Sequence, residues 1–154
     1  VIVSISFHIK KENIMKFLKI SLATILSITF SLSVFTLDLD GESFNLSGKI
    51  TSVEIKDGGG VIHVSSEAGR YGKVFLTYNV TVNPALPNQG YFSGKGVGFN
   101  DGQRQAGNRQ GVFRREGAIM NFYSLDDVSD GRLNYCETVI NLRTDAVEMT
   151  FYPF

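Results

Sequence analysis

The sequence predicts an all-β protein, a single eight-stranded antiparallel up-and-down barrel behind an N-terminal signal peptide. Three observations lead to this prediction. Apolar and polar residues alternate with a period of two along most of the chain, short turn motifs separate the runs, and no segment after residue 36 has the period of an amphipathic helix. Strands joined by short turns pair with their neighbours in sequence, and closing eight of them into a barrel removes both exposed sheet edges.

An apolar stretch near the start of the chain has the composition of a secretory signal. Residues 15–36, MKFLKISLATILSITFSLSVFT, place Lys16 and Lys19 ahead of an apolar run, which is the pattern of a signal peptide. Serines and threonines interrupt the run, so it is less apolar than a transmembrane span of about 20 residues, and this favours cleavage over anchoring. We expect residues 1–14 to be an upstream extension and residues 37–154 to be a secreted or periplasmic β-barrel domain with no stable membrane span.

The composition of residues 37–154 excludes several classes of function. This region holds 11 basic and 14 acidic side chains, which argues against nucleic acid as a partner because such binding depends on neutralising phosphates. Cys136 is the only cysteine and His63 the only histidine of this region, so neither an intramolecular disulfide nor a histidine-based metal cluster is possible. The acidic segment at 126–131, DDVSDG, lacks the spacing of a calcium loop. We therefore expect no metal, no cofactor, and a domain stabilised by its apolar core.

Eight runs bounded by Gly, Pro, Asn or Asp are typical of strands. In the first run the apolar phase slips between Ile50 and Val53, which predicts a bulge or bend. The third run alternates most regularly and places Val74, Leu76 and Tyr78 on one face. The predicted strands span residues 43–56, 61–67, 72–82, 90–100, 109–116, 118–126, 132–141 and 146–152.

The fourth predicted strand has glycine at three successive positions of one face, Gly94, Gly96 and Gly98. The missing side chains either permit sharp coiling and close packing of the barrel or make room for a ligand. The first explanation predicts that Gly96→Val destabilises the domain. No helix follows the glycines, so they do not form a phosphate-binding loop. We expect residues 100–111 to be a long polar loop that either covers one mouth of the barrel or is solvated.

The fifth and seventh predicted strands carry charged residues that suit a ligand site. Arg114 and Glu116 share one face of the fifth strand, and an arginine at a barrel mouth can bind a carboxylate through two hydrogen bonds. The seventh strand has Tyr135 and Glu137 on one face and Cys136 on the other, and the pattern leaves open which face points inward. If Glu137 is buried it needs a partner, for which Arg114 is a candidate.

The meander of eight short strands, with a glycine-rich central strand behind a signal peptide, resembles the allene oxide cyclase and dirigent type of barrel and, more loosely, the calycins. The resemblance is one of architecture and covers residues 37–154. It implies that small hydrophobic molecules are bound or steered inside the barrel, and that the plant members cyclise or couple them. No catalytic motif of these families is matched, and the absence of tryptophan excludes the Gly-x-Trp signature of lipocalins.

Two hypotheses of function lead, and a third accompanies them. The first is an exported small β-barrel that binds a small apolar or amphipathic molecule, with Tyr78, Arg114, Tyr135 and Glu137 as candidate ligand-binding residues. The second is a cyclase or isomerase type of enzyme on the same barrel, for which no catalytic residue is assigned. The third is a surface interaction module with a filled core. The main difference between the first and third hypotheses is whether the interior is hollow.

Overall fold

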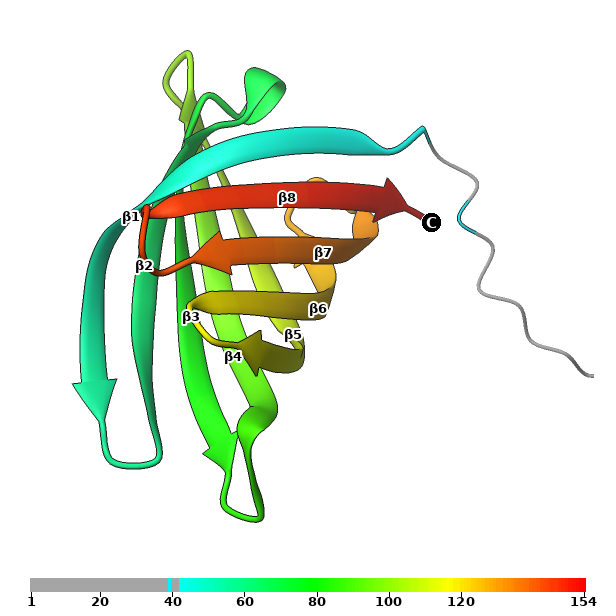
Figure 1. Ribbon diagram of the computed structural model, residues 1–154. Coiled ribbons are helices and arrows are strands. Elements are labelled where there is room, and N and C mark those ends of the chain that lie inside the picture. Colours follow the sequence, from blue (N-terminus) through cyan, green and yellow to red (C-terminus); the bar gives the residue numbers. More distant parts are fainter. Residues whose placement is uncertain (1–38, 40–41) are drawn as a thin grey trace, which may run out of the picture. The chain divides into compact units, whose positions relative to one another are not determined.

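The alternating runs form eight β-strands that close into one barrel (Figure 1). The structure is a computed structural model that describes Leu39 and residues 42–154; the expected upstream extension and signal peptide lie outside these residues. Every pair of neighbouring strands is antiparallel. The elements are β1 (Phe44–Lys56), β2 (Gly59–Glu67), the 3₁₀ helix η1 (Gly69–Tyr71), β3 (Lys73–Asn83), β4 (Leu86–Asn100), β5 (Gln103–Glu116), β6 (Ile119–Val128), β7 (Leu133–Asn141) and β8 (Ala146–Pro153). The predicted all-β barrel is confirmed.

The barrel closes because β1 pairs with two partners. Its first half pairs with β8, up to Lys49, and most of its length pairs with β2. The predicted bulge lies where the pairing with β8 ends, since Ile50 faces Val64 while Ser52 faces His63, leaving Thr51 as the extra residue. A bulge bends a strand, and β1 curves away from β8 and continues as a hairpin with β2 (Figure 1).

Most of the segment predicted as a long polar loop, residues 103–111, is instead part of β5. A two-residue turn, Asp101 and Gly102, joins β4 to β5, and both residues have positive φ angles, of 47° and 78°, as tight hairpin turns require. The prediction was wrong because the inward positions of β5 carry Gly107, Arg109 and Gly111 rather than apolar side chains. The strand therefore lacks the alternation by which strands are recognised.

One half of the barrel interior is filled by an aromatic cluster, Tyr78, Phe92, Phe113 and Phe122. Their ring centroids lie between 5.0 and 5.7 Å apart in four contacting pairs, which is the usual spacing of packed aromatic rings. All four side chains are buried in the hydrophobic core.

None of the described residues belongs to a helix long and apolar enough to cross a membrane.

Candidate ligand-binding cavity

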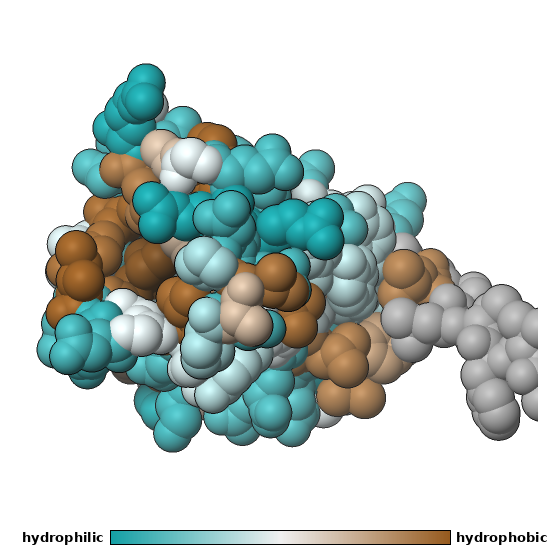
Figure 2. Space-filling view, turned by 60° about the horizontal axis from the view of Figure 1, so that its bottom comes forward, coloured by the Kyte–Doolittle hydropathy of each residue, from teal (hydrophilic) through white to brown (hydrophobic). Residues whose placement is uncertain are grey.

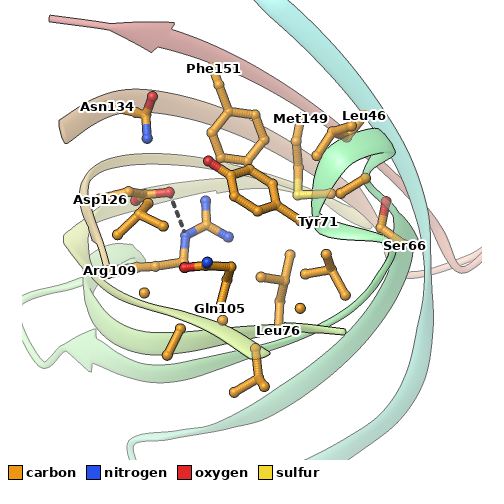
Figure 3. Close-up of a pocket in the computed structure, with 18 of the residues that line it drawn as sticks. Leu46, Ser66, Tyr71, Leu76, Gln105, Arg109, Asp126, Asn134, Met149 and Phe151 are labelled. Atoms are coloured by element: carbon orange, nitrogen blue, oxygen red, sulfur yellow. Dashed lines mark ion pairs between the residues drawn. The ribbon is translucent and has the colours of Figure 1, made fainter. Parts of the chain in front are cut away.

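The other half of the interior holds a cavity of about 80 Å³ next to η1. It is partly open to solvent, and most of its wall is apolar. Figure 3 shows side chains from several strands converging on it, with Arg109 and Asp126 at one side. The apolar wall includes Leu46, Leu76, Gly96, Gly98, Met149 and Phe151.

The inward face of β4 carries the glycine row, Gly94, Gly96 and Gly98, and the last two of these line the cavity. A Cβ atom at Gly94 would collide with the backbone carbonyl oxygen of Thr77, so this glycine allows close packing. A Cβ at Gly96 would meet only the terminal Cδ2 of Leu76, at 2.9 Å, and Gly96 lines the cavity. The two explanations for the row thus apply to different positions, with backbone crowding at Gly94 and at Gly98, where a Cβ would lie 2.7 Å from the Tyr71 carbonyl oxygen, and with space at Gly96 that only the flexible end of Leu76 limits.

A row of inward-facing residues crosses five strands between the aromatic cluster and the cavity. Tyr78, Gly94, Arg109, Asp126 and Asn134 face one another in direct cross-strand pairs from β3 to β7. We call these five residues the polar row. A Cβ at Gly94 would lie 3.8 Å from Cβ of Arg109, an ordinary contact, so the Thr77 carbonyl and not the arginine is what requires this glycine.

Arg109 is the centre of the polar row and is only 3% exposed. Its Nε lies 3.0 Å from Oδ2 of Asp126, an ion pair by distance, although the N–H direction does not make it a hydrogen bond. Nη1 donates to the Tyr78 hydroxyl at 2.7 Å, and Nη2 lies 3.0 Å from Sγ of Cys136. The Ser124 hydroxyl donates to Oδ1 of Asp126 at 2.7 Å. A buried charge needs such partners, because its removal from water is costly.

Burial sets the protonation of the groups around Arg109. Loss of solvent raises the pKa of Tyr78, and it raises the pKa of Cys136 to about 11, while the positive charge of Arg109 opposes both shifts. Both groups are therefore protonated at neutral pH. For Arg109, burial lowers the pKa, but the interactions with Tyr78 and Asp126 outweigh it and raise the pKa above its ordinary value. The site thus presents a cation, a neutral phenol and a thiol rather than a reactive thiolate.

Asn134 completes the polar row at β7 and lines the cavity. It is 4% exposed, and Figure 3 shows its amide on the cavity side of the strand. Within the described part of the chain its side chain has no hydrogen-bond partner. The residue as a whole is thus buried, while its unpaired amide atoms keep access to the cavity, since Nε of Arg109 is the one fully buried unpaired side-chain atom among the described residues.

The structure places the four predicted ligand-binding residues away from the cavity wall. Tyr78 is fully buried in the aromatic cluster and bonds to Arg109. Arg114 is exposed on the outer face of β5. Tyr135 and Glu137 are half-buried on the outer face of β7, where the tyrosine hydroxyl donates to the carboxylate at 3.1 Å.

The burial pattern of β7 answers the question that the sequence left open, namely which face of this strand points inward. Its inward residues are Asn134, Cys136, Thr138 and Ile140, which are buried. Among the described residues no ion pair joins Arg114 to Glu137. Burial, together with the hydrogen bond to the carboxylate, raises the pKa of the Tyr135 hydroxyl to about 12.

Sequence reasoning missed Arg109, Asp126 and Asn134 as site residues. Arg109 has the same strand parity as the buried Phe113, and this signal could have found it. Asp126 was read as part of an acidic turn, but it points inward to the arginine. The third acidic residue of that segment, Asp130, accepts a hydrogen bond from the Tyr71 hydroxyl at 3.0 Å. In the part of the chain that the structure describes, no three His, Cys, Asp or Glu side chains gather into a metal site.

A second hollow lies at the opposite end of the barrel, beside the β1–β2 and β3–β4 hairpins. Its volume is about 260 Å³, and its wall includes Val53, Ile55 and Val82. Figure 2, in which this end comes forward, shows hydrophobic side chains gathered there. Phe113 and Met120 form its inner wall and belong to the packed core. The cavity next to η1 is the stronger candidate because the buried polar row borders it.

Comparisons with models of known protein families, with curated proteins and with solved structures found no match to this chain. The class of protein is therefore defined by the fold and the cavity alone. The closed eight-stranded antiparallel barrel is consistent with a calycin-like architecture.

Proposed function

We propose that the protein binds a small amphipathic molecule in the cavity next to η1. The observation that carries this proposal is an apolar cavity, bordered by a buried ion pair, in a barrel whose other half is filled. A closed, empty cavity of this size would cost about 2 kcal/mol of stability at roughly 24 cal/mol per Å³, and this one costs less because it is partly open to solvent. Glycine in a strand also costs conformational entropy. Binding of a ligand explains why the sequence keeps this cavity and these glycines although both lower the stability of the fold.

The size of the cavity limits what it encloses. About 80 Å³ corresponds to roughly three water molecules at about 30 Å³ each, well below the roughly 300–1,000 Å³ of pockets for drug-sized ligands. The ligand is therefore either a short molecule or a longer one that inserts only its end. Any remainder extends through the open side of the cavity.

Export to the periplasm or the outside of the cell is part of the same proposal, and the signal-like residues 15–36 support it. The architectural resemblance to the allene oxide cyclase and dirigent barrels supports binding of a hydrophobic molecule in the interior. The enzyme alternative uses the same cavity. A chemical change in a molecule that co-purifies with the chain, seen as a change of its mass on incubation, would favour the cyclase or isomerase function.

Saturation-transfer NMR with 1-butanol as the probe tests the proposed function. The full-length protein should transfer saturation to the probe, whereas Gly96→Leu, which places a side chain in the cavity, should not. The matched control is Thr81→Leu, on the side of β3 opposite the buried Tyr78, Leu76 and Val74; it should bind as the parent does. Equal transfer in the parent and Gly96→Leu, or no transfer in the parent, would reject the proposal.

A further inference from the structure

Asn134 is a buried amide without a partner, and this feature points to a ligand. Its side chain has both donor and acceptor groups, and because its amide atoms are not among the fully buried unpaired atoms of the described residues, they stay accessible to a ligand from the cavity. It lines the cavity, is 4% exposed, and has no hydrogen-bond partner among the described residues. A leucine of similar size would be better suited to this position if the only role of the residue were packing.

Asp126 lies beside Asn134 and provides an acceptor next to that amide. The two residues are direct cross-strand partners on β6 and β7, a placement that brings Cβ atoms within about 4.5–5.5 Å. Oδ1 of Asp126 accepts one hydrogen bond from Ser124, and Oδ2 lies beside Arg109. A carboxylate offers about four lone-pair sites, so it retains the capacity to accept a hydrogen bond from a ligand.

The charges that border the cavity cancel. Arg109 and Asp126 are the only ionised side chains in its described lining, and they form an ion pair. The anion position beside Arg109 is therefore already taken by Asp126. A ligand carboxylate would have to approach this second carboxylate, and like charges in a poorly solvated site repel strongly.

We propose that the cavity selects a ligand whose polar end is an uncharged hydrogen-bonding group, a hydroxyl or a primary amide, held by Asn134 and Asp126. The hydroxyl or amide N–H donates to the Asp126 carboxylate, while the Asn134 amide donates to the ligand oxygen. The apolar remainder packs against Leu76 and Met149 on the cavity wall. This inference rests on the proposed function, because it names the ligand class for the same cavity.

NMR titration with a matched four-carbon series tests the selectivity. The probes are 1-butanol, butanamide and butyrate at pH 7, added to the full-length protein. We expect butyrate to bind at least about tenfold more weakly than 1-butanol and butanamide, because of the Asp126 carboxylate. Asn134→Leu should weaken both neutral probes by about tenfold, the loss of one hydrogen bond to a ligand.

The control variant is Asn121→Leu, the same change at a half-buried position on the outer face of β6. It should leave all three affinities unchanged. Binding of butyrate as tight as that of 1-butanol, or unchanged affinities in Asn134→Leu, would overturn the inference while leaving cavity binding intact. Absence of binding by all three probes would instead reject the proposed function on which it rests.

Discussion

The two halves of the barrel interior differ in how the same strand fills them. Along the inward face of β4, Phe92 packs against Tyr78 and Phe122 with ring centroids 5.4 and 5.0 Å away. The next inward positions of the strand are the glycine row, and there the cavity opens. An eight-stranded barrel has an interior that side chains can just fill. Whether it is solid or hollow therefore depends on the side-chain volume placed at a few inward positions.

The polar row separates these two halves, and breaking its ion pair should have the largest effect. Asp126→Leu leaves Arg109 charged, buried and without its counter-ion, and loss of one partner of a buried pair costs about 3–5 kcal/mol. Urea unfolding of the variant and the parent measures this difference in the free energy of unfolding. The double variant Arg109→Met/Asp126→Leu should recover at least half of the loss, because it removes both charges. A single variant as stable as the parent would contradict the account.

The glycine row allows a sharper comparison within one strand. Gly94→Ala should lower the free energy of unfolding by about 1–3 kcal/mol, because its Cβ collides with the Thr77 carbonyl oxygen. Gly96→Ala should change it by less than about 0.5 kcal/mol, because the only close atom is a terminal methyl of Leu76. Thermal unfolding of both variants gives the comparison. Equal losses of unfolding free energy in the two variants would mean that crowding, rather than open space, is the reason for the glycine at position 96.

Alkaline pH should lower the stability of the protein through ionisation of the Cys136 thiol, which lies beside the polar row. Burial raises the pKa of Cys136 from 9.0 to about 11, so its contribution to stability is complete below pH 9 and is lost as the pH rises through about 11. The slope of unfolding free energy against pH in this window should be shallower in Cys136→Ser, which keeps an acceptor for Arg109 but does not titrate there. Identical slopes in the two proteins would show that the thiol is not desolvated.

Much of the barrel could be predicted from the sequence because period-two alternation is a local property. The regular pattern of β3 correctly placed Val74, Leu76 and Tyr78 on one face, which is the buried one, and the phase slip in β1 located its bulge. The first half of β5 was missed for a physical reason. Its inward positions form the cavity wall and hold the buried arginine, so they carry glycine and polar residues instead of apolar ones.

The candidate site could not be predicted because it depends on register. Arg109, Asp126 and Asn134 come from three strands and meet only because the ladders place them opposite one another. A shift of one residue in either pairing would turn the side chains of one strand to the other face. The same limit applies to β7, where alternation separated Tyr135 and Glu137 from Asn134 without showing which set points inward.

The central claim, that ligand binds in the cavity next to η1 and not in the second hollow at the filled end of the barrel, whose inner wall includes Met120, can be tested with two reporter methyl groups. Met149 lines the cavity, and Met120 belongs to the packed core at the opposite end. Of the three methionines in the chain, the remaining one, Met15, lies outside the described residues. We expect titration of the full-length, ¹³C-methyl-methionine-labelled protein with 1-butanol to shift the Met149 signal in a saturable way and to leave the Met120 signal in place. A shift of Met120 alone, equal shifts of both, or no shift of either would contradict the account.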